Sequence, residues 1–255
     1  MAASRLILAI DTSCDDTSVA IVDRGRVVAN VVASQYQIHY HYGGVFPTLA
    51  KQAHQANLPA CVNAALRQAG LSQQQPSQAL AAVAVTVGPG LAPALEVGIA
   101  YAQQLAYKWQ LPLIAVNHIE AHALSPLLRP KSQTIPRQVK WPVLAMVISG
   151  GHSEFIVIKK PQVYQRLGWT IDDSAGECLD KIGRMLDLGY PAGPLIEQLA
   201  KKGDAQRFTL PLAMTDHADF NLSFSGLKTA AYQLIEQLKT QGQLDAQTSY
   251  DLAGS

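Results

Sequence analysis

The sequence predicts an α/β fold built from two successive lobes, and three observations support this prediction. Short apolar runs typical of strands alternate with longer runs at helical spacing. The turn Asp23-Arg24-Gly25 joins two of the first runs as a tight hairpin. After a polar segment at 131–140 the pattern of strands followed by a helix starts again. We therefore expect mixed sheets with crossover helices, in lobes at 1–130 and 131–255 that face a ligand-binding cleft.

The elements of the first lobe follow from apolar periodicity and from the residues that end each run. Gly70 is a natural C-cap for the first long helix, and Gly88-Pro89-Gly90 ends a continuous apolar strand of the kind that is buried on both faces. A second buried strand is expected at 113–116, and Pro130 ends the helix after it. The expected strands are 6–10, 18–22, 26–34, 80–87 and 113–116, and the expected helices are 46–70, 94–109 and 118–128.

The second lobe repeats this order without a close repeat in sequence. Strands are expected at 143–149, 154–159 and 164–169, with Gly150-Gly151 as the turn between the first two. A helix is expected at 175–188, and a further helix follows the rigid turn 190–194.

Composition limits the classes of function. The chain has 255 residues, of which 15% are charged, and a formal net charge of +1, so no global field recruits nucleic acid and any such binding uses a local patch or a partner. Three cysteines without a close pair indicate small core residues in a reducing cytoplasm. The N-terminus lacks the apolar run of a signal peptide, and no apolar stretch is long enough to span a bilayer. We expect a cytoplasmic protein that binds no membrane.

His118 and His122 are the candidate metal ligands. Residues four apart lie on one helix face, so both imidazoles can reach one ion. On spacing alone, a helix face carrying two histidines without a metal is an equal alternative. Glu120 lies two residues after His118 and about 200° round the helix, which excludes the general base of a HExxH metalloprotease. His152 is expected to contact a ligand rather than to be a third metal ligand.

Two strand-end segments are candidate phosphate contacts. Asp11, Thr12 and Ser13 end the first strand, where a carboxylate and small hydroxyls can hold phosphate or a cation. On these residues alone, a simple strand-ending turn is the better explanation. Gly150 and Gly151 let backbone N–H groups approach an anion, or form a plain hairpin. The two segments stand at matching places in the two lobes, which resembles the grip of actin-like proteins on a nucleotide phosphate tail.

A third group of candidates lies around the helix at 175–188. Asp172, Asp173 and Ser174 can cap this helix. Asp180 lies inside it, where capping is no explanation, and is suited to accept hydrogen bonds from a ribose; a solvated acidic face is an equal alternative. Gly193 would let a flat base lie against the backbone, and Glu197 is in the helix that follows; in isolation, a plain loop explains the turn at 190–194 better.

Together, eight segments in this order resemble the TsaD family (also called Gcp, YgjD or O-sialoglycoprotease). They are 10–15, 42–45, 88–91, 118–122, 149–152, 172–181, 191–194 and 221–229. The resemblance implies an actin-like (ASKHA, ribonuclease-H-like) two-lobed fold whose second lobe is incomplete here. It also implies a metal-dependent acyltransferase that moves threonylcarbamoyl from threonylcarbamoyl-adenylate to the N6 amine of the adenosine beside the anticodon, in tRNAs that read ANN codons.

The resemblance also assigns roles to residues. It implies one Fe²⁺ or Zn²⁺ per subunit on His118 and His122, and Asp11, Thr12 and Ser13 near the phosphates. The adenylate would lie on Ile148, Ser149, Gly150, Gly151 and His152, with Asp180, Gly193 and Glu197 against its nucleoside. No protein nucleophile is needed, because the mixed anhydride supplies the leaving group. The implied partners are tRNA, a TsaB-like paralogue and a TsaE-like ATPase that handles ATP and ADP; DNA is not expected.

Departures from the family pattern qualify these expectations. Family members are longer, and their third metal ligand, an Asp, and an Asn for the nucleotide are expected beyond Ser255. We therefore expect a truncated chain that is inactive alone. Thr48 and Pro93 stand where the family has Glu and Gly.

Two competing classes of function remain. One is a non-catalytic TsaB-like subunit, which lacks the His pair and the Ser-Gly-Gly-His turn. The other is an actin-like small-molecule kinase, which needs Mg²⁺–ATP and a catalytic acid.

Overall fold

The computed structural model describes residues 6–130, 132, 138–215 and 217–255, so most of the predicted linker lies outside the described residues. The chain divides into two compact units. Unit 1 comprises residues 1–38 and 45–139, and unit 2 comprises residues 39–44 and 140–255. Each unit has its own hydrophobic core.

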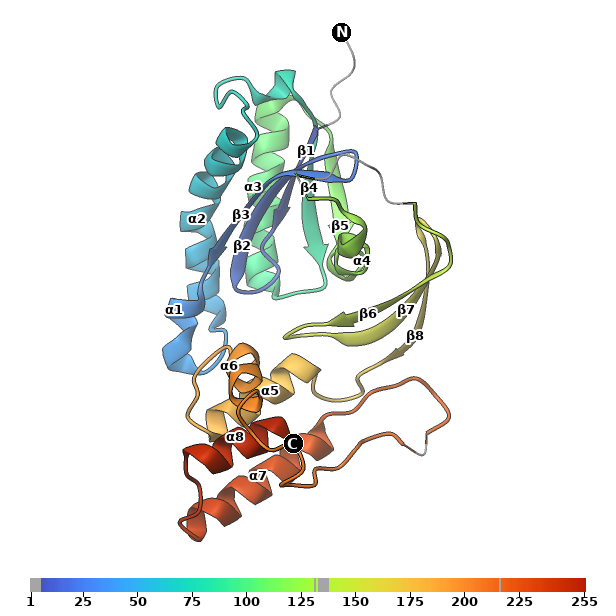
Figure 1. Cartoon of the computed structure of the whole chain (residues 1–255). Helices are drawn as coiled ribbons and strands as arrows, with labels where there is room; N and C mark the ends of the chain where they lie inside the picture. Colours follow the sequence, from blue (N-terminus) through green and yellow to red (C-terminus); the bar gives the residue numbers. More distant parts are fainter. Residues whose placement is uncertain (1–5, 131, 133–137, 216) are drawn as a thin grey trace. The chain divides into compact units, whose positions relative to one another are not determined.

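Unit 1 is built on a mixed five-stranded sheet (Figure 1). Its strands are β1 (Leu6–Asp11), β2 (Asp16–Asp23), β3 (Arg26–Ser34), β4 (Leu80–Gly88) and β5 (Leu113–Asn117), in the order β3-β2-β1-β4-β5. The first three are antiparallel, whereas β4 and β5 run parallel to β1. Arg24 and Gly25 both have positive φ, as a type I′ hairpin turn requires. The predicted hairpin and the mixed α/β class are confirmed.

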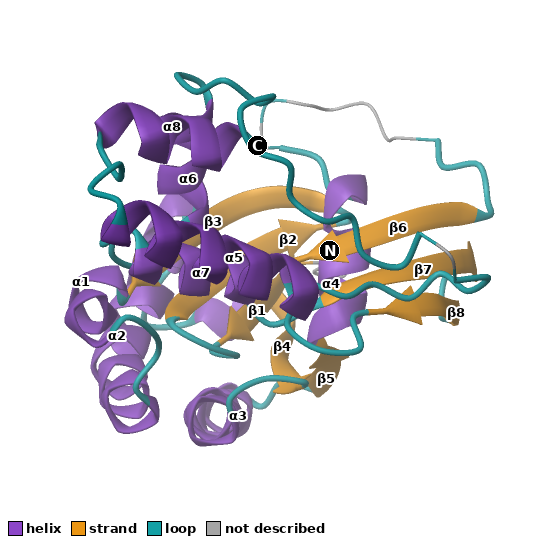
Figure 2. Cartoon of the chain, turned by 90° about the horizontal axis from the view of Figure 1, so that it is seen from below, coloured by secondary structure: helices purple, strands orange, loops and turns teal. Residues whose placement is uncertain are grey.

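Two long helices cover one face of this sheet and lie side by side (Figure 2). They are α2 (Pro47–Gln68), which packs on β2 and β3, and α3 (Ala92–Trp109), which packs on β4. Leu8, Leu58 and Val83 are fully buried between these layers. Unit 1 also contains α4 (His118–Leu124), and α1 (Tyr36–His39) follows β3.

The predicted burial of the strand at 113–116 is wrong. Leu113 and Ile114 are each 40% exposed. The reason is that β5 is the edge strand of the sheet, whereas β4 has a paired strand on each side and a helix over it. An apolar run predicts a strand, but it does not tell how many elements pack over that strand.

Unit 2 contains a three-stranded antiparallel sheet and a group of helices. The strands are β6 (Val143–Ile148), β7 (Ser153–Lys160) and β8 (Val163–Trp169), in that spatial order. The helices are α5 (Ala175–Met185), α6 (Gly193–Ala200), α7 (Ser225–Thr240) and α8 (Ala246–Gly254). α5 packs on α6 and α7, and α6 packs on α8, around a core that includes Cys178 and Ile235.

The edge strand β6 carries exposed apolar side chains, and we predict that it drives self-association. Leu144, Met146 and Ile148 alternate along one face and are 61%, 53% and 56% exposed, and within the described residues no strand pairs with the outer edge of β6. Such an edge is a template for pairing with another chain. Leu144→Lys combined with Met146→Lys should reduce the oligomer fraction in sedimentation velocity severalfold.

The matched control for this prediction is Tyr107→Lys, which removes an exposed apolar side chain from helix α3 rather than from a sheet edge. An equal drop in the oligomer fraction for both proteins would refute a role for the β6 edge.

Two further expectations concern cysteines and charge. Cys61 and Cys178 are buried, but the predicted burial of Cys14 is wrong, because it lies exposed in the loop after β1.

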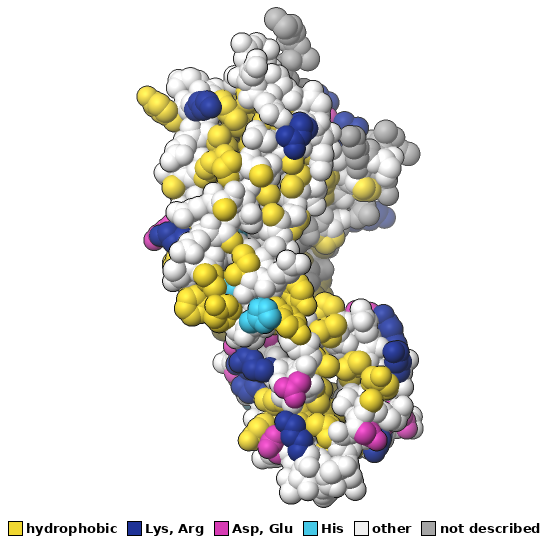
Figure 3. Space-filling view, turned by 90° about the vertical axis from the view of Figure 1, so that its left-hand side faces the viewer, with side chains coloured by type: hydrophobic (Ala, Val, Ile, Leu, Met, Phe, Trp, Pro, Cys, Tyr) yellow, Lys and Arg dark blue, Asp and Glu magenta, His cyan; other side chains and the backbone are white. Residues whose placement is uncertain are grey.

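On the face drawn in Figure 3, the described charged side chains stand singly or in small groups rather than as a continuous basic stripe. None of the helices in the described part of the chain has the length and apolar run that a membrane crossing requires.

Candidate functional site

The candidate site in unit 1 lies at the carboxyl ends of three neighbouring parallel strands. β1 ends at Asp11, β4 at Gly88 and β5 at Asn117, and these strands are adjacent in the sheet. The carboxyl ends of parallel strands are the edge at which ligands bind in α/β sheets. Residues that are far apart in the sequence therefore meet here.

The two histidines enter this site from α4, which begins directly after β5. Asn117 caps the helix by accepting hydrogen bonds from the backbone N–H groups of Ile119 and Glu120, at 2.9 Å and 3.1 Å. His118 is the first residue of α4 and His122 lies one turn later, so their Nε2 atoms come within 3.1 Å of each other. The predicted pairing of the two imidazoles on one helix face is present in the structure.

Asp11 connects the end of β1 to the histidine pair. Its Oδ2 accepts hydrogen bonds from Thr86 Oγ1 at 2.6 Å and from His118 Nδ1 at 3.1 Å, and its Oδ1 accepts one from Ser13 N at 2.8 Å. Burial raises the pKa of this carboxyl, but the hydrogen bonds from His118, Thr86 and Ser13 outweigh it and hold the pKa well below its usual range. Asp11 is therefore a carboxylate at neutral pH.

The donor set and its spacing fit two ligands of one transition-metal ion. Imidazole suits iron and zinc. Two nitrogens bound tetrahedrally at 2.0–2.1 Å from one ion lie about 3.3 Å apart, close to the separation of the two Nε2 atoms. Burial and the neighbouring His118 lower the pKa of His122, although Asp11 opposes this effect, so the ring is neutral and able to bind metal at pH 7. Within the described ranges no cluster of three or more His, Cys, Asp or Glu residues is arranged to hold an ion.

The rest of the first strand-end segment packs inward. Thr12 is fully buried and its hydroxyl donates to Ala94 O at 2.9 Å, on the first turn of α3. A Cβ added to Gly98 would lie 2.2 Å from Thr12 Oγ1, so this helix glycine permits the close approach. Ser13 is 6% exposed and its carbonyl accepts from Leu91 N. Thr12 and Ser13 thus hold the loop against α3.

The candidate site in unit 2 begins at the Gly-Gly turn between β6 and β7. Ser149 N donates to His152 O at 2.8 Å and His152 N donates to Ser149 Oγ at 3.0 Å, which closes the turn. Neither Gly150 nor Gly151 has a positive φ, and a Cβ on either would meet open space. These glycines therefore leave open space beside the backbone of the turn. They do not serve to allow a left-handed backbone conformation.

The first turn of α5 anchors the Gly-Gly turn. Ser174 Oγ donates to Gly150 O at 2.6 Å, and Gly176 N donates to Ser149 O at 3.3 Å. A Cβ on Gly176 would lie 2.6 Å from Ser149 O and 2.8 Å from Gly150 Cα. The backbone of the turn can approach α5 this closely because residue 176 is glycine.

α5 also carries Asp180, which fixes the start of α6. Asp180 Oδ1 accepts a hydrogen bond from Ala192 N at 2.7 Å, directly before Gly193. Glu197 lies four residues after Gly193 and forms an exposed ion pair with Lys201 at 2.8 Å. The structure thus brings Asp180 and Gly193 together at the start of α6, with Glu197 on the same helix.

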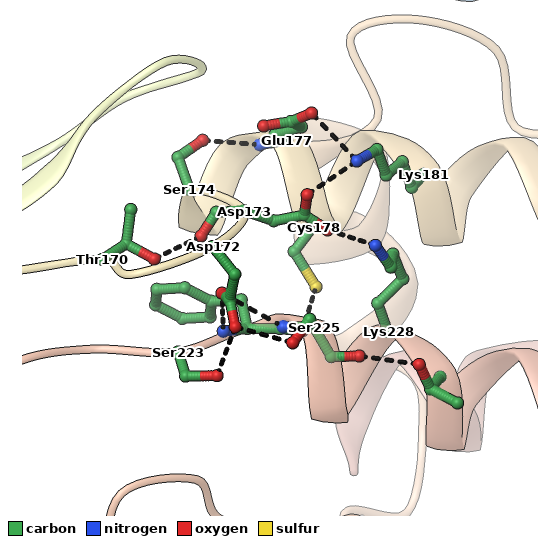
Figure 4. A network of polar contacts seen from close by, with 12 residues as sticks. Thr170, Asp172, Asp173, Ser174, Glu177, Cys178, Lys181, Ser223, Ser225 and Lys228 are labelled. Atoms are coloured by element: carbon green, nitrogen blue, oxygen red, sulfur yellow. Dashed lines mark hydrogen bonds and ion pairs between the residues drawn. The ribbon is translucent and has the colours of Figure 1, made fainter.

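The acidic residues before α5 have different roles from those predicted (Figure 4). Ser174 caps α5 as expected, since it accepts a hydrogen bond from Glu177 N at 3.1 Å. Asp172 instead binds the start of α7, accepting from Phe224 N at 2.8 Å and from the hydroxyls of Ser223 and Ser225 at 2.6 Å each.

Asp173 likewise bridges α5 and α7 rather than capping α5. Lys181, on α5, and Lys228, on α7, approach it at 2.7 Å and 2.6 Å. Capping of α5 by Asp172 and Asp173 is therefore wrong. Asp172 binds the start of α7, some fifty residues further along the chain, and Asp173 binds one lysine of α5 and one of α7.

The contacts of Asp172 predict an acid-sensitive contribution to stability. Burial raises the pKa of Asp172, but the hydrogen bonds from Ser223, Ser225 and Phe224 lower it to about 2. A depressed carboxyl pKa stabilises the fold above the unfolded value and loses this effect as the pH falls toward the folded value. Asp172→Asn should therefore reduce the free energy of unfolding by about 1 kcal/mol at pH 7, allowing for solvent screening of this exposed residue.

Urea midpoints at two pH values measure this effect. The difference between the wild type and Asp172→Asn should fall to about half near pH 3. A difference that is the same at pH 7 and pH 3 would show that the carboxylate charge is not what holds the start of α7.

Several residues of these sites were not predicted from the sequence. In unit 1, Thr86 donates a hydrogen bond to Asp11, and Asn117 caps α4. In unit 2, Lys228 pairs with Asp173. An Asn directly before a helix start is a recognisable N-cap signal and identifies Asn117. The contacts of Thr86 and Lys228 depend on the tertiary fold and have no local signal.

Comparison with known proteins assigns the chain to one family. The model of the family described as TsaD, tRNA N6-adenosine threonylcarbamoyltransferase, matches residues 26–254. A protein of that name from Phocaeicola vulgatus is 43% identical over 98% of this chain and 72% of its own length. Another from Thermosipho africanus is 43% identical over 91% of this chain and 67% of its own length.

Solved structures give more distant likenesses. Component A of the (R)-2-hydroxyglutaryl-CoA dehydratase of Acidaminococcus fermentans is 13% identical, with a TM-score of 0.48, over 98% of this chain and 73% of its own. YeaZ from Pseudomonas aeruginosa is 16% identical, with a TM-score of 0.42, over 96% of this chain and 99% of its own.

Proposed function

The chain belongs to the TsaD family of tRNA N6-adenosine threonylcarbamoyltransferases, and from this premise we propose how its residues serve the reaction. The acyl donor is threonylcarbamoyl-adenylate. The acceptor is the N6 amine of the adenosine beside the anticodon, in tRNAs that read ANN codons. The observation that best supports a metal-dependent form of this reaction is the pair of Nε2 atoms of His118 and His122, 3.1 Å apart at the strand ends.

The residues of unit 2 bind the adenylate. The turn from Ile148 to His152 takes the acyl-phosphate part, because its two glycines leave open space for an anion to approach the backbone. Asp180 and Gly193 lie together at the start of α6 and contact the nucleoside. Glu197 adds a contact from the same helix, after its exposed pairing with Lys201 yields to the ligand.

The residues of unit 1 serve the metal and the phosphates. His118 and His122 would hold one Fe²⁺ or Zn²⁺, with an Asp as the third ligand, and the ion would act as a Lewis acid toward the carbamoyl group. The loop of Asp11, Thr12 and Ser13 would lie near the phosphates, and Asp11 and Thr12 shape it through their contacts with Thr86 and Ala94. The anhydride of the donor already carries a good leaving group, so none of these side chains needs to act as a nucleophile.

The proposal includes partners and a location. A TsaB-like paralogue and a TsaE-like ATPase, which handles ATP and ADP, work with this chain in the cytoplasm. Because the net charge is only +1, part of the attraction for tRNA comes from these partners or from a local patch.

Transfer of a radiolabelled threonylcarbamoyl group to unmodified tRNA tests the proposal. The chain is combined with both partners, the donor substrates and tRNA. Label is expected on the adenosine next to the anticodon of ANN-reading tRNAs. Phosphate transfer to a small molecule without labelled tRNA would refute the proposal in favour of an actin-like kinase.

A further inference from the structure

Asp11 contacts His118 on one ring nitrogen while His122 contacts it on the other. The carboxylate lies 3.1 Å from Nδ1, and His122 Nε2 lies 3.1 Å from Nε2. We propose that Asp11 is a positioning residue for the metal: it holds the His118 ring with its proton on Nδ1, so that Nε2 presents its lone pair to the ion. This inference rests on the metal site proposed above and adds a residue that is not itself a ligand.

The proton assignment follows from the chemistry of the two groups. A carboxylate can only accept hydrogen bonds, so the proton in the contact between Asp11 and His118 belongs to Nδ1. A neutral imidazole has one N–H, and its other nitrogen is then an acceptor or a metal ligand. A carboxylate behind a ligating histidine fixes the orientation of the ring and makes the ligand more basic.

Asp11 is itself held firmly enough to orient a ring. Thr86 Oγ1 donates to the same oxygen as His118, and Ser13 N donates to the other oxygen. Thr86 lies on β4, the parallel neighbour of β1, so hydrogen bonds from two adjacent strand ends define the place of the carboxylate. The side chains of Asp11 and His118 are 30% and 16% exposed, which limits competition from water.

The same geometry assigns the proton of His122. With Nε2 of His118 as the acceptor, His122 Nε2 must donate in the contact between the two rings. A metal ion bound to Nε2 of His122 would displace this proton, and the neutral ring of His122 would then carry its proton on Nδ1. His118 would keep its proton on Nδ1. Metal binding should therefore change the tautomer of His122 but not that of His118.

Nuclear magnetic resonance of the wild-type chain with isotope-labelled histidine tests this assignment directly. In the metal-free chain, His118 is expected to carry its proton on Nδ1 and His122 on Nε2. After addition of Zn²⁺ both rings should carry it on Nδ1. A metal-free His118 protonated on Nε2 would overturn the proposal, and this readout does not depend on any variant being stable.

Zinc affinity, measured by competition with a chromophoric chelator, gives the second test. Asp11→Asn keeps the size of the side chain but removes its charge, and should weaken Zn²⁺ binding about 10- to 100-fold. The matched control is Asp16→Asn, the same change at the exposed start of β2, which should stay within about twofold of the wild type. Circular dichroism verifies that both variants are folded.

His118→Ala separates this inference from the metal site on which it rests. If His118→Ala loses Zn²⁺ binding while folded Asp11→Asn binds as the wild type does, Asp11 has no positioning role and the metal site stands. If His118→Ala binds Zn²⁺ as the wild type does, the metal site itself is wrong and the inference fails with it.

Discussion

Replacing His122 with alanine is expected to abolish metal binding and threonylcarbamoyl transfer while leaving the fold intact. His122 is exposed on α4, and alanine has the highest helix propensity, so the substitution should not destabilise the helix. The substitution removes one of the two imidazole nitrogens that lie 3.1 Å apart. Zinc affinity should fall by more than about 100-fold, beyond the effect of a residue that only supports a ligand.

The measurement combines chelator competition with the tRNA transfer assay on the complex with both partners. His217→Ala is the control, because it removes an exposed histidine of unit 2 that lies outside the proposed sites. Loss of both readouts in His122→Ala but in neither for His217→Ala is the expected result. Transfer and zinc binding at the wild-type level in His122→Ala would exclude the metal-dependent mechanism.

The elements of the fold could be predicted because their signals are local. Asp23-Arg24-Gly25 predicted a hairpin, and β3 begins and ends where the apolar run does, at Arg26 and Ser34. Burial was harder to predict, as β5 shows. Its apolar run resembles that of β4, but only the order of strands in the sheet determines which of the two lies at the edge.

In the candidate site, too, the local features could be predicted from the sequence and the long-range contacts could not. His118 and His122 lie within one turn of a helix, so their spacing alone suggested a pair. Asp11 and His118 are 107 residues apart, and Asp11 and Thr86 are 75 apart. Their contacts exist because β1, β4 and β5 are parallel neighbours, which no local pattern encodes. For the same reason, Asp172 and Asp173 resembled caps of α5, whereas Asp172 binds the start of α7 and Asp173 bridges α5 and α7.

The second large effect is expected from one methyl group at Gly176. The first turn of α5 lies against the Gly-Gly turn that we propose as the adenylate site. A Cβ on residue 176 would come 2.6 Å from Ser149 O and 2.8 Å from Gly150 Cα, and both neighbours are backbone atoms. Because neither can move without moving the turn, Gly176→Ala should displace the turn from α5.

This displacement should reduce both the stability of the fold and the affinity for nucleotide. Overpacking of this kind typically destabilises by about 1–3 kcal/mol. The backbone N–H groups of the turn would also lose the position set by the bond from Ser174 to Gly150. We expect affinity for the adenylate, or for AMP as its stable analogue, to fall at least about tenfold. Misplaced hydrogen-bond donors should cost roughly 1.4 kcal/mol of binding free energy, which corresponds to that factor. Isothermal titration calorimetry measures it.

Gly226→Ala is the matched control, because Gly226 occupies the same second position of α7 that Gly176 occupies in α5. A Cβ there meets open space, so the helix should gain stability by up to about 1 kcal/mol and nucleotide affinity should not change. The two variants make the same chemical change at equivalent helix positions and differ in what the new methyl group meets. Equal nucleotide affinity in both variants would mean that the approach of α5 to the Gly-Gly turn does not shape the adenylate site, and that the adenylate binds elsewhere.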